Sequence, residues 1–260
     1  MALRDPAART ATGIATRADL TGQEGGNPAT LLDASWRDFI YAEVWTRPGL
    51  DLRARFLISM AGAAALGDAE ATERYAHGAL LKQKLTLAEL REAALHTAVY
   101  AGWSTGGVLD AAITRAATAL GLPPAEIPPI REKPWDPDVR HRQGQENFHS
   151  VMRFGGPSPE TAYFEGGIIN FVFGEMWKRP GLDERSRRWL TLVGVCNSSS
   201  TIPIGSHIWS AMASGNATAD EMYEFVLQYA IHAGWPRGSV AQSAVMKQAD
   251  RVAKGLPFEP

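Results

Sequence analysis

The sequence predicts an all-α protein that consists of two similar helical modules in tandem. Apolar residues recur with the period of an α-helix along most of the 260-residue chain, and the alternation typical of strands is scarce. The segment Glu43–Asp51 is repeated 132 residues later as Glu175–Asp183, and the Ala-Gly-Trp tripeptide at 101–103 returns at the same offset at 233–235. A repeat of this length is too large for a solenoid unit and indicates a duplicated module.

The first helix of each module is expected to end at a Pro-Gly pair, because proline and glycine break helices. In the first copy this helix lies near Trp36–Thr46, before Pro48. Asp51 and its counterpart Asp183 follow the pair, and an aspartate in that position can accept hydrogen bonds from the first backbone N–H groups of a helix. A second helix is therefore predicted after each aspartate.

A capping box marks the start of a later helix in each copy. Thr86 is followed three residues later by Glu89, and Thr218 is followed in the same way by Glu221. In this arrangement each side chain bonds the backbone N–H of the other residue. Both helices are expected to end at the glycine of the Ala-Gly-Trp tripeptide. One further helix is predicted in each copy, over Val108–Leu120 and Val240–Ala253.

Changes in amino-acid composition along the chain indicate where its segments and modules begin and end. Residues 122–138 contain six prolines, which favour an extended, semi-rigid connector. Residues 1–33 are rich in Ala, Thr, Gly and Arg, and we interpret them as a mobile N-terminal arm that can wrap a neighbouring subunit. The predicted order is the arm at 1–33, the first module at 34–121, the connector at 122–138 and the second module at 139–260.

Composition and charge exclude several classes of function. The 26 Lys and Arg residues nearly balance the 28 Asp and Glu residues, and there is no long basic run, so nucleic acid is not an expected partner. No segment approaches the roughly 20 apolar residues that span a bilayer, so no membrane association is expected. The lone Cys196 cannot form an internal disulfide, which is typical of a cytoplasmic protein.

The second copy of the repeat resembles the γ-carboxymuconolactone decarboxylase family. The resemblance rests on the string Gly174–Asp183, on Arg187, on His207 in a following helix and on the Ala-Gly-Trp ending. It covers about residues 35–120 and 139–255. Members of the family are all-helical homo-oligomers, often hexamers of single modules. The resemblance therefore implies a homo-oligomer in which a trimer of tandem chains takes the place of a hexamer.

The family has two chemical branches, which the residues distinguish. The peroxidase branch, similar to alkylhydroperoxidase D, uses a Cys-x-x-Cys pair ahead of a histidine; with His207 as that histidine, Ser200 and Pro203 occupy the cysteine positions. Without a dithiol there is no thiolate nucleophile, so the chain resembles the branch that works without cysteines. Relatives commonly carry a glutamate beside the motif arginine, whereas the matched positions here are Phe56 and Arg188. An arginine there can attract a substrate carboxylate or stabilise an enolate.

Polar residues share one face of the capping-box helix. In the first copy Glu92, His96 and Tyr100 lie at positions i, i+4 and i+8. The matched residues of the second copy are Glu224, Gln228 and His232. A carboxylate behind a histidine can orient the imidazole and raise its pKa, as in a general acid or base, with Gln228 relaying in the second copy. The alternative is that the glutamates lie on the surface and that His96 is a core histidine with satisfied hydrogen bonds.

The copies differ where chemistry is expected. The second copy holds His207, His232 and Arg188. The matched residues of the first copy are Tyr75, Tyr100 and Phe56. We therefore expect the second copy to be the active module. The reverse assignment, with His96 and Tyr100 as the catalytic pair, stays open.

Aromatic and polar side chains near these motifs are the candidate substrate-binding residues: Trp103, Trp209, Trp235, Ser200 and Gln228. A ring-lined pocket suits a flat, apolar substrate, although large aromatics at helical spacing are more often core residues. The six histidines show no paired ligand spacing, so no metal site is predicted. There is no glycine motif that would cradle a phosphate, so no organic cofactor is predicted either.

These observations lead to three hypotheses about function. The first is a cofactor-independent lyase or isomerase that decarboxylates a small carboxylated lactone or conjugated keto acid. In it, Arg188 holds negative charge while His207 and His232 move protons. The second is a non-catalytic protein that binds a small ligand or acts as a scaffold on the same fold. The third, a thiol peroxidase, requires a reactive Cys196.

Overall fold

The described part of the chain is built from helices. The computed structural model describes residues 5–23, 27–130 and 136–259, and these residues contain helices, turns and extended connections but no strand. The predicted all-α class is therefore confirmed.

The helices follow one another in a similar order in the two halves. Those of the first half are α1 (Pro6–Thr21), α2 (Leu31–Ser35), the π-helix η1 (Trp36–Val44), α3 (Leu52–Ala65), α4 (Ala69–Leu81), α5 (Leu87–Ala101) and α6 (Trp103–Ala119). Those of the second half are α7 (Pro137–Met152), the π-helix η2 (Tyr163–Phe173), the 3₁₀ turn η3 (Met176–Lys178), α8 (Glu184–Asn197), α9 (Thr201–Ala213), α10 (Ala219–Ala233) and α11 (Trp235–Ala253).

The predicted helix starts are confirmed at matched positions. Asp51 accepts a hydrogen bond from the Ala54 backbone N–H at 2.8 Å, and Asp183 accepts one from the Ser186 N–H at 2.8 Å. Both capping boxes form, at the starts of α5 and α10. Helices α3 to α6 begin 132 residues before helices α8 to α11, as two copies of one module would.

The last helix of each half begins earlier than expected. Gly102 and Gly234 end α5 and α10 with φ angles of 93° and 86°, a conformation that glycine adopts without the steric cost of a side chain. Helices α6 and α11 then begin directly at Trp103 and Trp235. The glycine therefore turns the chain on its own, and no loop separates the two helices.

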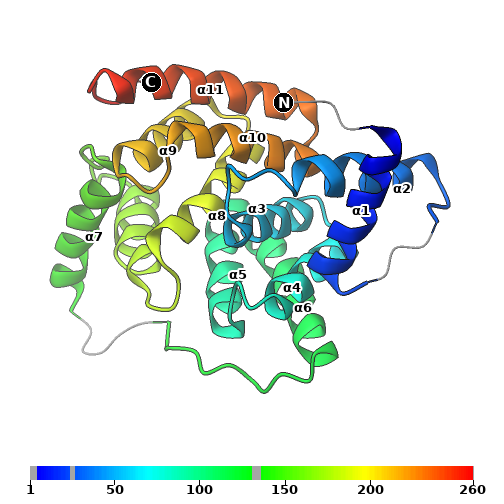
Figure 1. Cartoon of the computed structure of the whole chain (residues 1–260). Coiled ribbons are helices and arrows are strands. Elements are labelled where there is room, and N and C mark those ends of the chain that lie inside the picture. The colour runs from blue at the N-terminus through cyan, green and yellow to red at the C-terminus, as the bar shows by residue number, and fades with distance from the viewer. Residues whose placement is uncertain (1–4, 24–26, 131–135, 260) are drawn as a thin grey trace.

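Two central helices carry the contact between the halves. Figure 1 shows α3 and α8 in the middle of the molecule, where they pack against each other. Helix α5 of the first half packs on α8, and helix α10 of the second half packs on α3. Each half therefore completes the surroundings of the other half's central helix.

The repeated motif supplies an ion pair across this contact in each direction. Arg47 Nε lies 2.8 Å from Glu224 Oε1, and Arg179 Nε lies 2.9 Å from Glu92 Oε2. The motif glycine leaves room for the pair, because a Cβ at Gly181 would lie 3.2 Å from the Glu92 Cγ atom, and its φ of +91° disfavours other residues. The two glutamates are thus buried partners of arginines rather than surface residues.

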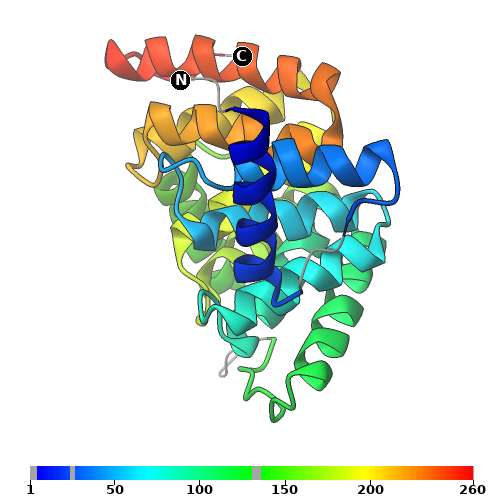
Figure 2. The ribbon, with the colours of Figure 1, turned by 45° about the vertical axis from the view of Figure 1, so that its right-hand side comes forward.

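The N-terminal segment, interpreted above as a mobile arm, contains a docked helix. Asp5 caps α1, which packs against η1 and α4 (Figure 2). A Cβ at Gly13 would lie 2.0 Å from the Arg37 carbonyl oxygen, so glycine permits this close approach. In the second half, Gly144 of α7 meets the Ile169 carbonyl of η2 in the same way, at 2.2 Å. Helix α1 therefore holds the place in the first half that α7 holds in the second.

The connector leaves α6 and lies against the second half. Its residues 122–130 form no helix, and Arg179 donates hydrogen bonds to the carbonyl oxygens of Pro129 at 2.7 Å and Ile130 at 3.1 Å. The next part of the predicted connector, residues 131–135, lies outside the described residues.

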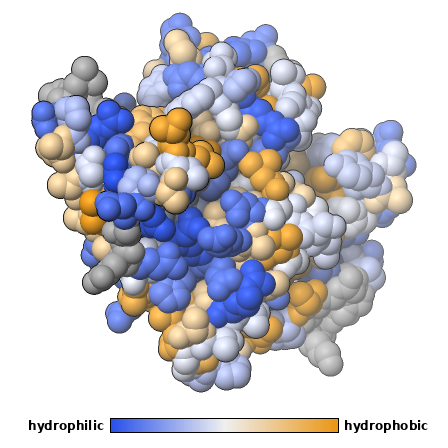
Figure 3. All heavy atoms as spheres, turned by 90° about the vertical axis from the view of Figure 1, so that its right-hand side faces the viewer, coloured by the Kyte–Doolittle hydropathy of each residue, from blue (hydrophilic) through white to orange (hydrophobic). Residues whose placement is uncertain are grey.

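The face beside α1 and α2 is mixed in character. Figure 3 shows polar side chains across it with small apolar groups scattered among them. Among the helices that the structure describes, none combines the length and the apolar character needed to cross a membrane.

Candidate active site

A cavity of about 500 Å³ lies in the second half, between α7, η2, α8 and α9 and the end of α5. Small-molecule sites usually have volumes of about 300–1,000 Å³. Most of the lining is apolar or aromatic: Val99, Phe148, Met152, Phe154, Pro157, Tyr163, Phe164, Ile168, Val172, Phe173, Gly194, Val195, Ile202, Pro203 and Phe258. The polar lining residues are Tyr100, Ser198, Ser206 and His207.

His207 and Tyr100 meet at the inner end of the cavity. Their ring centroids are 5.4 Å apart, with the rings nearly perpendicular. The Tyr100 oxygen accepts a hydrogen bond from Trp177 Nε1 at 2.7 Å, so the phenolic proton is available to another acceptor. His207 is buried, and its Nδ1 has no hydrogen-bond partner among the described residues. Two groups capable of proton transfer therefore face one apolar space.

A buried cation stands beside this pair. Arg188 is completely buried, with its guanidinium 5.0 Å from the centroid of the Trp177 ring. Its Nη2 donates to the Val151 carbonyl oxygen and to Glu184 Oε1, the latter at 3.1 Å. Its Nε and Nη1 have no hydrogen-bond partner within the described chain. Arg188 is not among the residues that line the cavity, so its charge acts on Tyr100 and His207 through the protein.

Burial sets the protonation states at the inner end. It lowers the pKa of His207 to about 3, and the positive charge of Arg188 acts in the same direction. Burial raises the pKa of the Tyr100 phenol to about 12. Burial also lowers the pKa of Arg188, which as an arginine still keeps its charge. At neutral pH the site therefore holds a neutral imidazole, a protonated phenol and a fixed positive charge.

His96 lies behind Tyr100 and is held by two neighbours. Arg187 Nη1 lies 3.4 Å from His96 Nδ1, and Nε2 lies 2.9 Å from Thr191 Oγ1. Because a guanidinium can only donate, Nδ1 is the acceptor and the ring proton is on Nε2. Burial and then the Arg187 charge hold the pKa of His96 well below its usual value. The expectation that Glu92 raises this pKa is wrong, because Glu92 pairs with arginines and an arginine faces the imidazole.

The matched contact between α3 and α10 shows the same arrangement without a histidine. Arg55 Nη1 donates to Gln228 Oε1 at 2.7 Å, and Gln228 Nε2 donates to Ser59 Oγ at 2.8 Å. Gln228 therefore joins an arginine to a hydroxyl, as His96 does, and it does not relay between Glu224 and His232. Since glutamine performs the same bridging, the histidine at position 96 acts as a neutral hydrogen-bonding group.

The structure separates His232 from His207. Residue 232 is on α10, which packs on α3, and its ring lies 5.8 Å from that of Trp36 and 5.5 Å from that of Tyr75. Burial lowers the pKa of His232 to about 4. The grouping of His207, His232 and Arg188 in one site is therefore corrected: the cavity is lined by His207 together with Tyr100 of the first half, and Arg188 is buried close to both.

The predicted substrate-binding residues lie outside the lining. Trp103 is exposed and stacks on Phe171, with the ring centroids 6.0 Å apart, and Trp235 is also exposed. Trp209 is buried with its Nε1 bonded to the Leu256 carbonyl at 3.2 Å. Ser200 is the exposed cap residue of α9, and Gln228 of α10 is buried and bonded to Arg55 and Ser59 of α3.

The aromatic walls contributed by α7 and η2 were not predicted. One difference between the copies could have indicated this cavity. The position of Trp36 in the first copy is occupied by the smaller Ile168 in the second. Trp36 of the first half packs near His232 of α10, whereas the smaller Ile168 lines the cavity in the second half. The loss of an indole at one matched position is therefore one reason for the open space in the second half.

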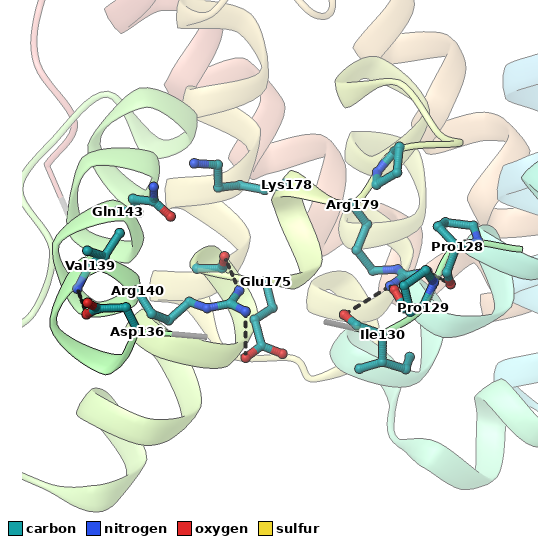
Figure 4. A pocket seen from close by; sticks show the side chains of 12 residues that line it. Pro128, Pro129, Ile130, Asp136, Val139, Arg140, Gln143, Glu175, Lys178 and Arg179 are labelled. Atoms are coloured by element: carbon teal, nitrogen blue, oxygen red, sulfur yellow. Dashed lines mark hydrogen bonds and ion pairs between the residues drawn. The ribbon is translucent and has the colours of Figure 1, made fainter. Parts of the chain in front are cut away.

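A second hollow of about 220 Å³ lies between the connector and α7 (Figure 4). Arg140 lies 3.5 Å from Glu175, and Arg179 points toward the connector and donates hydrogen bonds to its carbonyl oxygens. These cations already have structural partners, so this hollow is a weaker candidate for a substrate site.

The described residues give little support for metal-dependent or thiol-based chemistry. They contain no group of three or more His, Cys, Asp or Glu side chains placed to hold a metal ion. Cys196 is buried, and burial raises the pKa of its thiol to about 12, so it is not a reactive thiolate at neutral pH.

Comparison with known proteins identifies the family. Residues 31–112 match the family model described as the carboxymuconolactone decarboxylase family. A 4-carboxymuconolactone decarboxylase of Acinetobacter baylyi is 31% identical over 97 residues, which are 37% of this chain and 69% of that protein. A nitrosuccinic acid decarboxylase of Metarhizium robertsii is 31% identical over 113 residues, which are 43% of this chain and 77% of that protein. The chain belongs to the carboxymuconolactone decarboxylase family.

Proposed function

We propose that this protein is a decarboxylase-type lyase whose active site is the inner end of the cavity, at Tyr100, His207 and Arg188. The observation that carries the proposal is that a protonated phenol, Tyr100, and a neutral imidazole, His207, line one apolar cavity, with the buried charge of Arg188 close enough to act on both. The proposed substrates are small carboxylated lactones or conjugated keto acids. The reaction is proposed to proceed without a cofactor.

Arg188 stabilises the negative charge of the reaction. Before the reaction that charge is on the substrate carboxylate. When the bond between the carboxyl carbon and its neighbour breaks, carbon dioxide leaves and the electron pair moves into the conjugated carbonyl, which becomes an enolate. A fixed cation in a water-poor site favours this step because the site does not have to reorganise as the charge moves.

Tyr100 supplies the proton that completes the reaction. The enolate carbon takes the phenolic proton, and the resulting tyrosinate later recovers a proton from water. Trp177 Nε1 already donates to the phenolic oxygen at 2.7 Å, so it stabilises the tyrosinate as it forms. The high pKa of Tyr100 keeps the phenol protonated until an enolate is present.

His207 takes part as a neutral hydrogen-bonding group. With a pKa of about 3 it carries no charge at neutral pH, so it does not compete with Arg188 for the substrate anion. Its unpartnered Nδ1 can bond a substrate hydroxyl or a carboxyl group at the inner end. This role differs from the proton transfer expected of His207 from the sequence.

The relatives support the reaction class. Both are named as decarboxylases of acids, 4-carboxymuconolactone and nitrosuccinic acid, in which an electron-withdrawing group is present in the same molecule. An acceptor for the electron pair within the substrate removes the need for a cofactor that would serve as an electron sink.

The test is carbon dioxide release by the purified protein without added metal or cofactor. The first substrate is γ-carboxymuconolactone, followed by a panel of carboxylated lactones and conjugated keto acids. We expect release from at least one acid, and a loss of release in Arg188→Gln but not in Arg142→Gln, whose side chain is exposed. Folding of both variants is checked by circular dichroism. Folded wild-type protein that binds these acids without releasing carbon dioxide would instead support the non-catalytic binding protein.

A further inference from the structure

We propose that Phe258 determines the size of the acids that the cavity accepts, and that Arg251 is the positioning residue that holds Phe258 in the cavity wall. The ligand class is a small acid with an apolar body that extends toward the Phe258 ring. The inference rests on the proposed function in taking the same cavity as the binding site. It concerns which ligands fit, and binding alone tests it.

The segment after α11, residues 254–259, folds back over the second half. Helix α11 ends at Ala253, and Gly255 follows with a φ angle of 64°, which glycine adopts without the steric cost of a side chain. The Leu256 N–H then donates a hydrogen bond to the Arg251 carbonyl oxygen at 2.9 Å. In the first half the chain runs from α6 into the connector, which contacts Arg179 instead. The folded-back segment is therefore a feature of the half that contains the cavity.

Arg251 of α11 holds this segment on both sides of Phe258. Its Nε and Nη2 donate to the Pro257 carbonyl oxygen at 3.0 and 2.7 Å, and its Nη1 lies 2.6 Å from Glu259 Oε2. The matched residue of the first half is Ala119, which has no side-chain donor. Because the residues before and after Phe258 are both bonded to one guanidinium, Arg251 fixes the place of the ring between them.

The Phe258 ring fills a space between α9 and the residue that follows α7. It stacks on Phe154 with the ring centroids 5.3 Å apart and lies 6.2 Å from the Trp209 ring. A Cβ at Gly205 would lie 3.5 Å from Phe258 Cε2, so the ring also contacts the backbone side of α9. Trp209 Nε1 donates to the Leu256 carbonyl oxygen at 3.2 Å and so holds the same segment on α9. Phe258 is therefore a packed part of the wall and not a freely rotating surface ring.

This part of the wall limits the length of a bound ligand. Among the lining residues that the structure describes, Phe258 is the only one that follows α9 in sequence. The hydrogen-bonding groups Tyr100 and His207 meet at the inner end, so an acid binds with its polar group there and its apolar body along the aromatic walls. Each buried methylene adds roughly fourfold to affinity. Affinity is expected to rise with the length of the body until the ring prevents further burial.

The test measures this limit with a series of 4-alkylbenzoates, from 4-methylbenzoate to 4-octylbenzoate, by isothermal titration calorimetry on the full chain. We expect the wild-type affinity to rise roughly fourfold per methylene up to a limiting length and then to stop rising. In Phe258→Ala the limit should move to chains at least two methylenes longer, and in Phe258→Trp it should move to shorter chains. The same limit in all three proteins, a wild-type affinity that rises through the whole series, or no binding of any member would each overturn the inference.

The positioning role of Arg251 has its own variant. Arg251→Ala introduces the residue of the first half and keeps the Phe258 ring, but it removes the donors to the Pro257 carbonyl. We expect its limit to move toward longer chains, as in Phe258→Ala, because the ring is no longer held in the wall. Lys254→Ala, which removes an exposed pair with Asp250, should keep the wild-type limit. A wild-type limit in folded Arg251→Ala would refute the positioning role, since a general loss of stability would not change the limit.

The outcomes separate this inference from the proposed function. A shifted limit in the Phe258 variants without carbon dioxide release from any acid of the panel would leave the size-determining role standing and refute the decarboxylase. Carbon dioxide release together with an unchanged limit in the variants would leave the decarboxylase standing and refute the role of Phe258.

Discussion

At the scale of single residues, the inner end of the cavity derives its chemistry from burial. Tyr100, His207 and Arg188 are ordinary side chains, but removal from water leaves the phenol protonated, the imidazole neutral and two guanidinium N–H groups without partners. The sequence named all three as candidates. It could not group them, because Tyr100 comes from α5 of the first half and reaches the second half only through the packing of α5 on α8.

Replacement of Tyr100 by phenylalanine removes the proposed proton donor and keeps the ring. General acid–base groups typically contribute roughly 10²–10⁴-fold to a rate. We therefore expect Tyr100→Phe to lower the rate of carbon dioxide release by at least about 100-fold at unchanged folding. Tyr223→Phe on the surface of α10 is the control. A rate within threefold of wild type would remove Tyr100 from the mechanism.

His207 is expected to make stability depend on pH. Its pKa of about 3 in the folded protein lies below the value near 6.5 of an unfolded chain, so the unfolded state binds more protons between these values. The free energy of unfolding therefore falls as the pH is lowered from about 6.5 toward 3. Between pH 7 and pH 5.5 a single such group contributes a decrease of about 1 kcal/mol.

Urea unfolding of His207→Phe at the two pH values checks this contribution. We expect the variant to lose about 1 kcal/mol less than wild type on acidification, because it lacks the group that must protonate. His149→Gln, at an exposed position of α7, is expected to behave as wild type. A decrease in His207→Phe equal to that of wild type would contradict the buried neutral state.

At the scale of elements, local signals predicted several helix starts but missed other helices, α1 and α7 among them. The aspartate caps and the capping boxes involve residues three apart in sequence, and they formed as expected. Helices α1 and α7 were not predicted, because their segments are polar and bury few side chains. Their docking depends on Gly13 and Gly144, whose close contacts with η1 and η2 are tertiary and leave no periodic pattern.

The bridging role of His96 is tested by replacing it with glutamine, the residue found at the matched position 228. Gln228 joins Arg55 to Ser59, so a glutamine at position 96 should join Arg187 to Thr191. We expect His96→Gln to keep carbon dioxide release within about tenfold of wild type and His96→Ala to lose considerably more. Inactivation by glutamine with folding unchanged would indicate that the imidazole itself is needed.

The cross-half ion pairs are expected to hold the two halves together. Glu92→Ala leaves Arg179 and Arg187 buried without their carboxylate, and breaking a buried pair typically costs about 3–5 kcal/mol. We expect a decrease of that order in the free energy of unfolding. Asp250→Ala, which breaks an exposed pair with Lys254, should change it by less than about 1 kcal/mol.

At the scale of the whole molecule, the two halves share a framework and differ in their interior. The motif, the caps and the cross-half pairs recur at matched positions, whereas Phe56, Tyr75 and Trp36 of the first half are matched by Arg188, His207 and Ile168 in the second. Aromatic rings of the first half pack around His232 of α10, whereas the matched space of the second half, next to Tyr100 of α5, is a cavity. We infer one active site per chain, formed by helices of both halves.

Assembly is expected to cover two exposed tryptophans. Trp103 and Trp235 occupy matched positions and are 63% and 54% exposed, and large exposed rings often mark contact surfaces. We expect light scattering of the purified protein to give the mass of three chains and the double variant Trp103→Glu/Trp235→Glu to give one. A wild-type protein that runs as a single chain would contradict the trimer.

The central claim is that a single site, at the inner end of the second-half cavity, performs the decarboxylation. The most direct measurement is carbon dioxide release by Tyr100→Phe and by His232→Phe, which alter matched positions of the two halves, with the best acid of the panel. The account predicts a loss of at least about 100-fold for Tyr100→Phe and less than about fivefold for His232→Phe. A large loss in His232→Phe with little change in Tyr100→Phe would place the chemistry in the first half and contradict the account.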